Sequence, residues 1–393
     1  MSDTRKSPTA SQIRRNDHRR SESKGHVAVF QTAMEIGGIE RVLLNLIQEL
    51  DDRGYTVDLV LTRSEGEFLS EVPDAVSIVD LDPTAVPGVG VFSAVPSLIR
   101  YLRRAEPEAL LSGKPHTNLV ALIASRLSGV EIRTILGLNA MLSHHLETTD
   151  TLKYRTIILL SKYLYRFADE IVVASEGSKM DAATVLEMPM DTMRVIHNPV
   201  VTPRLLERAD EPLDHPWFSD DAPPVVLSVG RLHPHKDYAN LIRAFARVRA
   251  TRDAKLVIIG EGDRRDQLTA LVEELGLEDD VSLPGSETNP YPYMRRASVF
   301  ALSSITEALP LALIEAMACT CPVIATDCSS GPVEILDGGR VGPLVPPNDP
   351  DALAEAIIDT LDDPPDEAIL RERAMDFSVA TIADEYEQAL FPE

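Results

Sequence analysis

Two acidic residues in the last third of the chain are placed to bind hydroxyl groups beside the start of a helix. Glu307 and Glu315 are separated by seven residues in the stretch SSITEALPLALIEAMACTCPVIATD. Glu307 follows an apolar run, and Pro310 suits the first turn of the helix that carries Glu315. Backbone N–H groups from Leu309 to Leu311 suit phosphate or sugar oxygens, and the two carboxylates suit neutral hydroxyls. The plainer alternative is that these acids only offset the helix dipole.

Two basic residues follow the first strand of the same half of the chain. The stretch SVGRLHPHKD ends an apolar run at Gly230 and then presents Arg231 and Lys236 in one loop. Two cations at the carboxyl end of a strand suit a diphosphate. A solvated basic loop is the alternative. We interpret His233 and His235 in this loop as solvated side chains rather than ligands.

A pair of glycines near the beginning of the chain also lies at the carboxyl end of a predicted strand. Gly37 and Gly38 stand between the strand-like run HVAVFQ and a stretch with helical apolar spacing, 39–50. Small residues there let backbone N–H groups approach an anion at the positive end of a helix. Many turns between a strand and a helix use two glycines for geometry alone, so this signal is weak by itself.

Two other patterns imitate ligand sites. The segment Gly260 to Gly262 supplies two glycines of the dinucleotide fingerprint, but Arg265 stands where the third belongs, and an acid lies between the glycines. NAD is therefore not expected. The triplet Asp80-Leu81-Asp82 imitates a metal-chelating acid pair, which a single triplet in an acid-rich chain can produce by chance.

The cysteines do not indicate a metal site either. Cys319, Cys321 and Cys328 fall within ten residues, and a closed zinc site would need a fourth ligand from elsewhere. We interpret them as small buried side chains. The sequence thus predicts no metal and no bound cofactor.

Alternating strands and helices must position these groups. Apolar runs of strand length alternate with helical periodicity from His26 to about 195, and a second such series begins with VVLSVG. This predicts an α/β fold with two doubly wound, Rossmann-like domains, whose ligand lies at the carboxyl ends of the strands in the cleft between them.

The boundaries follow from composition. Residues 1–25 are basic and almost without apolar side chains, which predicts a disordered tail. Residues 26–205 form the first domain, 206–377 the second, and a Pro- and Asp-rich stretch near 200–223 the linker. The last helix, within 378–393, is expected to pack back on the first domain.

The overall charge excludes one class of partner. The 393 residues contain 38 Lys and Arg against 62 Asp and Glu, a formal charge of −24, which has the wrong sign for nucleic-acid binding. Residues 1–25 lack the apolar core of a signal peptide, and no apolar run is long enough to cross a bilayer. We expect a cytoplasmic protein, peripheral on the inner face of the membrane if it binds lipid.

One segment departs from the acidic background. TLKYRTIILLSKYLYRF, around residues 152–167, interleaves Lys and Arg with Ile, Leu, Tyr and Phe. A basic amphipathic helix can rest on an anionic bilayer. An ordinary helix that packs on the sheet explains the pattern equally well.

Taken together, these motifs resemble a known family. The cluster around Glu307, with GRLHPHKD, GGIERVLLNL, IHNPV and VGPLVPPNDPDALAEAI, is similar to the retaining glycosyltransferases of family 4, which have the GT-B fold. The resemblance covers most of residues 26–362. It implies that Glu307 holds sugar hydroxyls, that Glu315 holds a ribose, and that Arg231 and Lys236 neutralise the leaving diphosphate.

The resemblance also has departures. Relatives usually have Gly after the first Glu, where this chain has Ala308, and Gly before Cys-Pro, where it has Thr320. Ala308 puts the identity of the donor in doubt, whereas Thr320 is expected to affect packing. In the first domain, the resemblance implies that His116 or Asn118 reaches the reacting centre and that Gly38 closes on the diphosphate.

The resemblance implies a metal-independent transfer from a nucleotide-sugar, with a UDP-sugar favoured, to a glycan or polyprenyl-linked acceptor. Two alternatives remain open from the sequence. One is a nucleotide-sugar epimerase or phosphorylase of the same fold, and the other is a catalytically idle sugar-nucleotide binding protein.

Overall fold

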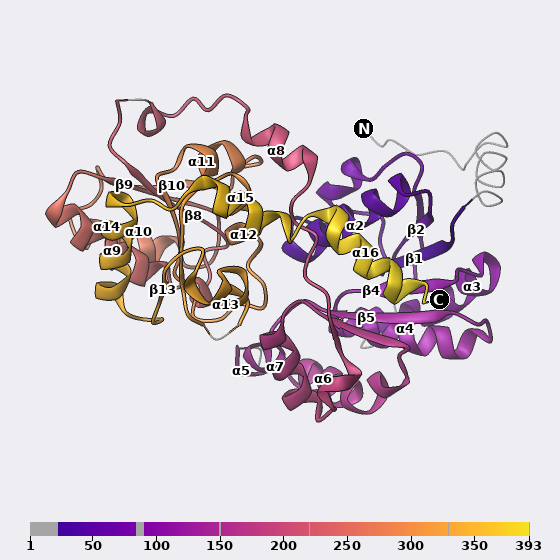
Figure 1. The fold of residues 1–393 in the computed structure, drawn as a ribbon. Coiled ribbons are helices and arrows are strands. Elements are labelled where there is room, and N and C mark those ends of the chain that lie inside the picture. The colour runs from indigo at the N-terminus through magenta and orange to yellow at the C-terminus, as the bar shows by residue number, and fades with distance from the viewer. Residues whose placement is uncertain (1–22, 84–89, 149–150, 220, 329, 393) are drawn as a thin grey trace, which may run out of the picture.

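The chain forms two lobes, each built on a parallel sheet (Figure 1). The computed structural model describes residues 23–83, 90–148, 151–219, 221–328 and 330–392. The sheet of the first lobe has the order β3-β2-β1-β4-β5-β6-β7, and that of the second lobe β10-β9-β8-β11-β12-β13. The expected pair of doubly wound, Rossmann-like domains is confirmed.

The strands are short and mostly buried. Their bounds are β1 His26–Gln31, β2 Thr56–Leu61, β3 Ser77–Asp80, β4 Ala109–Ser112, β5 Arg133–Leu138, β6 Glu170–Val173, β7 Arg194–Val195, β8 Val225–Val229, β9 Lys255–Ile259, β10 Val281–Gly285, β11 Val299–Leu302, β12 Val323–Thr326 and β13 Leu344–Val345.

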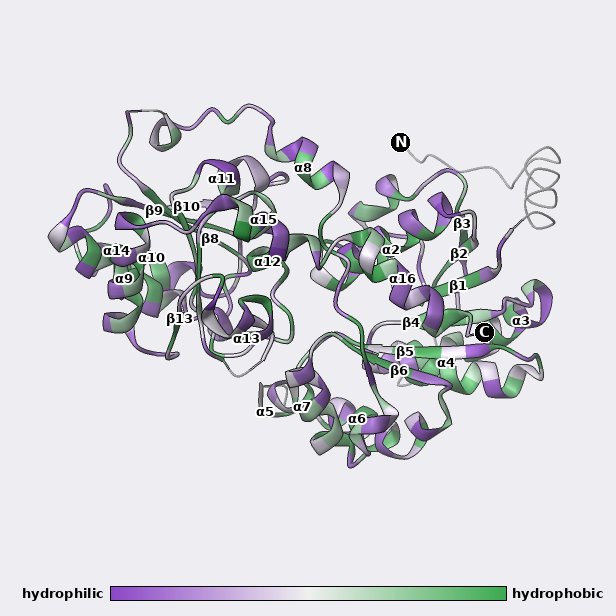
Figure 2. Cartoon of the chain, viewed as in Figure 1, coloured by the Kyte–Doolittle hydropathy of each residue, from purple (hydrophilic) through white to green (hydrophobic). Residues whose placement is uncertain are grey.

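Helices cover both faces of each sheet. Their bounds are α2 Gly38–Asp52, α3 Val95–Ala105, α4 Pro115–Ser128, α5 Leu142–Thr148, α6 Leu152–Leu164, α7 Glu176–Leu186, α8 Pro203–Ala209, α9 Tyr238–Thr251, α10 Arg265–Glu274, α11 Tyr291–Arg296, α12 Leu311–Ala318, α13 Gly331–Ile335, α14 Pro350–Asp362, α15 Glu367–Met375 and α16 Val379–Leu390. Figure 2 shows hydrophobic residues concentrated in the strands and hydrophilic ones on the outward turns of the helices.

The strand order reverses beside the first strand of each sheet. In the first lobe β1 pairs with both β2 and β4, and in the second β8 pairs with both β9 and β11. Loops on either side of such a reversal diverge and leave a crevice at the carboxyl ends of the strands. The segments that follow β1, β4, β8 and β11 carry Gly38, His116, the Arg231–Lys236 loop and Glu307, so the topology directs these groups to the facing edges of the lobes.

The chain crosses between the lobes twice. The outgoing segment passes through Val200 and Val201, whose N–H groups both donate to Phe377 O, at 3.0 and 3.1 Å. In the returning segment, Val379 N donates to Val201 O at 2.9 Å. The two crossings therefore form one short parallel pair. Helix α8 lies in the stretch assigned to the linker, beside the boundary between the lobes (Figure 1).

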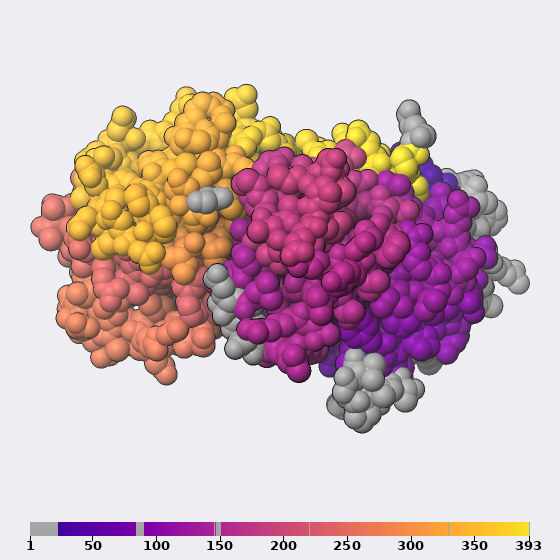
Figure 3. Space-filling model, turned by 90° about the horizontal axis from the view of Figure 1, so that it is seen from below, coloured from indigo at the N-terminus to yellow at the C-terminus, as the bar shows by residue number. Residues whose placement is uncertain are grey.

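The last helix, α16, lies on the first lobe beside α2 (Figure 1). Ile382, Tyr386 and Leu390 are buried in the core that the first sheet shares with α2. At the helix surface, Arg53 pairs with Asp384 and Glu387 at 2.6 and 3.0 Å. Figure 3 shows the boundary between the N-terminal lobe, coloured indigo to magenta, and the C-terminal lobe, coloured orange to yellow.

The predicted tail falls almost wholly on residues 1–22, outside the described residues. Of its last three residues, Ser23 donates to Gly25 O at 2.8 Å and Lys24 N donates to Gly54 O at 3.2 Å. Residues 23–25 of the predicted tail thus lie against the first lobe. Within the described part of the chain, no helix combines the length and apolarity that a bilayer crossing requires.

Candidate functional site

Lys236 and Glu307 meet at the centre of the second lobe's facing edge. Lys236 Nζ lies 2.5 Å from Glu307 Oε1, and Ser304 Oγ donates to the same oxygen at 2.6 Å. The two loops are also joined through their backbones, because Ile305 N donates to His235 O at 2.8 Å and Ser303 Oγ donates to Lys236 O at 2.7 Å. The structure thus brings the predicted cation and the predicted carboxylate into one ion pair.

Two glycines under this loop explain the imitation of a dinucleotide fingerprint. Gly260 has a φ of +148°, and a Cβ there would lie 2.0 Å from Gly230 O. A Cβ on Gly262 would lie 2.3 Å from Leu232 O. The turn after β9 therefore packs directly against the loop of Arg231 and Lys236, where only glycine fits. These glycines therefore support the cationic loop.

Two helix N-termini from opposite lobes converge beside the pair. Helices α2 and α12 both begin without a hydrogen bond from a capping side chain. A Cβ built on Gly38, the first residue of α2, would lie 3.3 Å from Leu311 Cδ1, the first residue of α12. Unsatisfied N–H groups and the positive ends of the helix dipoles favour an anion at this place.

One detail of the predicted helix start is wrong. Pro310 was expected in the first helical turn, but it precedes the helix as its N-cap, with ψ of 106°. Because proline has no N–H, only Leu309 and Leu311 can donate from this predicted set. Leu309 is buried and Leu311 is half-buried.

Arg231 completes the cationic group in a different way. Its side chain is exposed and makes no hydrogen bond or ion pair with any residue that the structure describes. Lys236 is held by Glu307, whereas the Arg231 guanidinium has no hydrogen-bond partner among the described residues. An ammonium and a guanidinium in one loop are chemically suited to a diphosphate.

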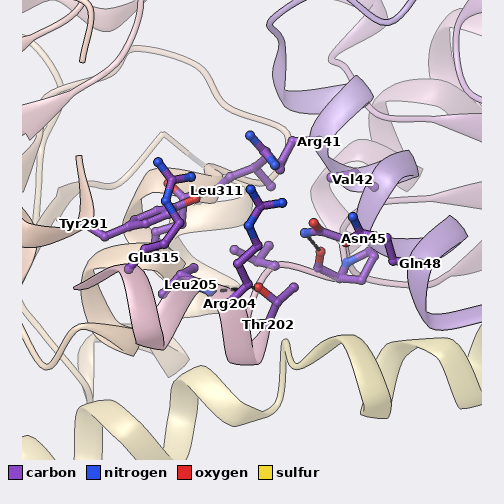
Figure 4. Close-up of a pocket in the computed structure, with 13 residues that line it drawn as sticks. Arg41, Val42, Asn45, Gln48, Thr202, Arg204, Leu205, Tyr291, Leu311 and Glu315 are labelled. Carbon is purple, nitrogen blue, oxygen red and sulfur yellow. Dashed lines mark hydrogen bonds between the residues drawn. The ribbon is translucent and has the colours of Figure 1, made fainter. Parts of the chain in front are cut away.

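Glu315 lies apart from Glu307, in a narrow cavity between the lobes. Figure 4 shows its carboxylate beside Tyr291, facing Arg41 of the first lobe. Tyr291 Oη donates to Glu315 Oε1 at 3.4 Å. Burial raises the pKa of Glu315 to about 7, although the Arg41 guanidinium and the Tyr291 hydrogen bond oppose the shift.

This cavity is nearly closed. Its volume is about 20 Å³, which is room for about one water molecule. Its walls come from α2, from the crossing segment with α8, and from α11 and α12: Arg41, Val42, Asn45, Gln48, Pro199, Val200, Thr202, Arg204, Leu205, Arg208, Tyr291, Leu311 and Glu315. Any larger group at Glu315 therefore requires the lining side chains or the lobes themselves to move apart.

His116 stands in the first turn of α4, at the facing edge of the first lobe. Burial, with smaller effects of Lys114 and Lys153, lowers its pKa to about 4, so the imidazole is neutral at pH 7. Lys114, just before this helix, pairs with Glu40 in the first turn of α2. The ion pair fixes the two loops of the first lobe that carry His116 and Gly38.

Asn118 was the other residue proposed for the reacting centre, and the structure excludes that role. Its side chain is fully buried. Ser112 Oγ donates to Asn118 Oδ1 at 2.6 Å, and Asn118 Nδ2 donates to Gly137 O at 2.9 Å. Asn118 therefore joins β4 to β5 inside the lobe, and His116 remains the candidate.

The sequence suggested that the histidines of the cationic loop are solvated, and the structure shows that this is wrong. His235 is half-buried, and burial, with the adjacent Lys236, lowers its pKa to about 4. Its ring lies 2.5 Å from His233 between Nδ1 atoms, and packs edge-on against His144 of α5 with centroids 5.8 Å apart. His144 of the first lobe thus contacts the cationic loop of the second lobe. No sequence spacing could reveal this contact between distant segments.

The motifs that were set aside have structural roles. Asp80 accepts hydrogen bonds from Ser64 N at 3.1 Å and Asp82 N at 2.9 Å, which fixes the loop at an edge strand. Cys319 and Cys321 are buried free thiols, as expected, and burial raises the pKa of Cys319 to about 12. Thr320 has a φ of +60°, directly after the last residue of α12 and its C-cap Cys319. Glycine is the usual residue at that left-handed position.

Two Rossmann-like lobes with cations, carboxylates and helix N-termini at their facing edges have the architecture of the GT-B class of enzymes. The comparisons agree. The family described as glycosyl transferases group 1 matches residues 211–377, and that described as glycosyltransferase family 4 matches residues 36–204. The chain belongs to glycosyltransferase family 4, and it is a glycosyltransferase.

Relatives and solved structures extend over nearly the whole chain. The N-acetylgalactosamine-N,N'-diacetylbacillosaminyl-diphospho-undecaprenol 4-alpha-N-acetylgalactosaminyltransferase of Campylobacter jejuni is 29% identical over 86% of this chain and 90% of its own length. The amylovoran biosynthesis glycosyltransferase AmsD of Erwinia amylovora is 27% identical over 78% and 82%. The crystal structure of Anabaena HepE with UDP and glucose has a TM-score of 0.75 at 20% identity, over 94% of this chain and 100% of that one.

Proposed function

We propose that this enzyme transfers a sugar from a nucleoside diphosphate sugar, with a UDP-sugar favoured, to a hydroxyl of a polyprenyl-linked or polysaccharide glycan. We further propose that the transfer retains the anomeric configuration and needs no metal ion. The observation that carries the proposal is the Lys236–Glu307 pair at 2.5 Å, beside the uncapped starts of α2 and α12.

The leaving diphosphate is where charge develops during such a transfer. Lys236, Arg231 and the N-termini of α2 and α12 place positive charge at one point before the substrate arrives. Preorganised positive charge stabilises a developing anion without the cost of reorienting water. These groups do the work that a divalent cation does in metal-dependent enzymes, which is the physical reason to expect metal independence.

The two carboxylates have separate roles. Glu307 lies at the cationic centre and accepts hydrogen bonds from hydroxyls of the transferred sugar, while Glu315 lies in the interlobe cavity and accepts them from the ribose. Glu307 orients the sugar rather than attacking it. The neutral His116 contributes from the acceptor side, where an uncharged imidazole can hydrogen-bond a hydroxyl at pH 7.

The relatives support the nature of both substrates. The name of the Campylobacter jejuni enzyme states a diphospho-undecaprenol acceptor and an N-acetylgalactosaminyl donor group, and HepE was crystallised with UDP and glucose. Together with the sequence CPVIATDCSSGPVEIL, these names favour a UDP-N-acetylhexosamine as donor and a lipid-linked glycan as acceptor.

A membrane-facing surface fits a lipid-linked acceptor. The outer face of α6 and the turn after it leave Leu152, Leu159, Tyr163 and Phe167 exposed by 83, 54, 58 and 52%. Lys153, Arg155 and Arg166 are exposed on the same segment. In a chain with a formal charge of −24, basic and apolar side chains on one helix face complement an anionic lipid surface. We propose that α6 rests on the membrane beside the acceptor.

A donor screen followed by a transfer assay tests the function. Thermal shift with UDP-, GDP- and ADP-sugars identifies the donor, and we expect stabilisation by a UDP-sugar. Transfer to a short-chain polyprenyl diphosphate glycan is then followed with and without EDTA, and the product's anomeric configuration is read by NMR. We expect equal rates in EDTA and retention. An inverted product contradicts the mechanism, and donor binding with no transfer to any acceptor supports the idle binding protein instead.

Vesicle sedimentation tests the membrane contact. Wild-type protein is expected to sediment with vesicles containing about one third phosphatidylglycerol and not with pure phosphatidylcholine. The double variant Leu159→Asp, Tyr163→Asp should lose sedimentation, while Ile369→Asp, which alters a residue 41% exposed on α15 of the other lobe, should not. Unchanged binding of the α6 variant would place the membrane contact elsewhere.

A further inference from the structure

Glu334, in the short helix α13 of the second lobe, contacts the first lobe at two points. Its Oε1 accepts a hydrogen bond from Gly177 N at 3.0 Å, in the first turn of α7. Its Oε2 lies 3.4 Å from His197 Nε2, in the segment that leads out of the first lobe. One carboxylate therefore joins a helix of the opposite lobe to the crossing segment.

The electrostatics favour this position for an ionised carboxylate. Burial alone would raise the pKa of Glu334, but the hydrogen bond from His197 and those from the backbone N–H groups of Gly177 and Glu176 outweigh burial and hold it below its ordinary value. The N–H groups belong to the positive end of α7, an 11-residue helix. His197 is itself held in place, since its ring packs edge-on against the buried Phe377 with centroids 5.2 Å apart.

Ser330, four residues before Glu334, contacts the loop that carries Glu307. Ser330 Oγ donates to the carbonyl oxygen of Glu307 and lies 3.3 Å from that of Ala308. A Cβ on Gly331 would lie 2.4 Å from Ala308 O and 2.7 Å from Leu309 Cα, so the segment lies directly against this loop. The backbone that presents Glu307 thus rests on residues 330 and 331.

The first lobe also contacts Ser330. A Cβ on Gly177 would lie 2.6 Å from Ser330 Cβ and 2.7 Å from Ser330 Cα. Met141, also from the first lobe, has its sulfur 3.9 Å from Ser330 Oγ. Ser330 is therefore enclosed between α7 on one side and the Glu307 loop on the other, with no space to absorb a displacement from either.

We propose that Ser330 and Glu334 are positioning residues that make the placement of Glu307 depend on the contact between the lobes. Glu334 anchors α13 to α7 and to the crossing segment, and Ser330 carries that anchoring to the Glu307 carbonyl. If the enzyme acts on a nucleotide-sugar as proposed above, the lobes separate to admit it, and the contacts of Gly177 with Glu334 and Ser330 are lost until closure, while Ser330 keeps its hydrogen bond to the Glu307 carbonyl. The Glu307 loop is thus fully supported only in the closed enzyme, which limits reaction of the donor before the acceptor lobe is in place.

Hydrogen–deuterium exchange of the ligand-free enzyme tests the positioning role without any assumption about substrates. The reporter is the peptide covering residues 303–311. Gly177→Ala changes only the other lobe, and its added methyl displaces Ser330, while Glu334→Ala removes the anchor itself. A hydrogen bond to a charged group corresponds to about 10- to 100-fold in an opening equilibrium. We expect exchange of the 303–311 peptide to rise at least about tenfold in both variants.

Two matched variants serve as controls. Thr184→Ala lies on the exposed side of α7, and Glu372→Ala removes an exposed carboxylate from the second lobe. Both should leave the 303–311 exchange within about twofold of wild type. If Gly177→Ala alone fails to fold, as judged by its melting curve, Glu334→Ala and Ser330→Ala carry the test.

A second readout separates positioning from general damage. UDP serves as the probe of the donor side, whose main contacts lie in the second lobe, and its Kd should change less than about threefold in Glu334→Ala. The turnover number for transfer should fall at least about tenfold, as expected for loss of an interaction formed only in the closed state. Exchange at 303–311 that stays at the wild-type rate in both Gly177→Ala and Glu334→Ala overturns the proposal, as does an equal rise in the Glu372→Ala control.

Discussion

Replacement of Lys236 gives the sharpest test of the cationic centre. Lys236→Met keeps the length and most of the volume of the side chain and removes the charge, and Lys236→Ala removes both. In the structure the ammonium lies 2.5 Å from Glu307 Oε1, and the two side chains are only 16 and 11% exposed. The pair is thus well shielded, and water can replace the lost charge only in part.

The size of the effect follows from Coulomb's law. Two unit charges about 4 Å apart interact by about 4 kcal/mol at an effective dielectric constant of about 20. The leaving diphosphate gains about one unit of negative charge in the transition state, and water entering the Ala variant recovers part of the loss. Loss of one such stabilising group costs about 10²- to 10³-fold in turnover, or about 2.7–4 kcal/mol. We expect a turnover lower by this factor in both variants.

The assay is the initial rate of nucleoside diphosphate release at saturating donor and acceptor. Lys255→Met provides a control, because Lys255 forms a comparable ion pair with Asp280, at 2.7 Å, at the start of β9 and away from the cleft. That variant should lose stability but keep its turnover. A Lys236→Met enzyme that works within about threefold of wild type would refute the proposed charge neutralisation.

Three further predictions concern the other residues of the cleft. Burial raises the folded pKa of Glu315 to about 7, above its unfolded value, so the free energy of unfolding falls as pH rises from about 4.5 through 7. Glu315→Gln should therefore melt about 2–4 °C higher than wild type at pH 8 but not at pH 4.5. The same variant should bind UDP more weakly at pH 8. Because burial lowers the folded pKa of His116 to about 4, the unfolded chain takes up a proton first, and the free energy of unfolding falls as pH falls below about 6.5. His116→Gln should therefore make the melting temperature depend less on pH between 6.5 and 4.5, and it should lower turnover at pH 7.5 by about 10²-fold. An unchanged turnover would remove His116 from the site. Thr320→Gly should relieve the left-handed strain at φ +60° and raise the free energy of unfolding by about 0.5–1 kcal/mol in urea titrations, with unaltered turnover; a loss of stability would show that the Thr320 hydroxyl, 3.3 Å from Arg295, matters more than the backbone.

The fold and the centre of the site were predictable because both depend on local patterns. Alternating apolar periods fix two parallel sheets, and the carboxyl ends of the strands then determine where Lys236 and Glu307 lie. Their residue types also indicate the chemistry, since a cation and a carboxylate on adjacent loops suit a diphosphate and a sugar. The Lys236–Glu307 contact follows from that adjacency.

Contacts between the lobes could not be predicted in the same way. His144 packs against His235, and Glu334 reaches Gly177 and His197, yet each pair joins segments far apart in the sequence with no shared period or motif. Their geometry depends on how two separately folded lobes dock. Asn118 shows the reverse error, because a polar residue near a predicted site was assigned to chemistry although two buried hydrogen bonds already occupy its amide group.

The return of α16 to the first lobe has a consequence for biosynthesis. Helix α16 contributes Ile382, Ala383, Tyr386, Ala389 and Leu390 to a core whose other buried members lie before residue 200. A ribosome releases the N-terminal lobe first, yet that lobe lacks part of its interior until α16 emerges. Nascent chains stalled before α16 should therefore present an unfinished apolar surface, and a premature termination before α16 that spares every active-site residue would still leave the enzyme vulnerable to proteolysis.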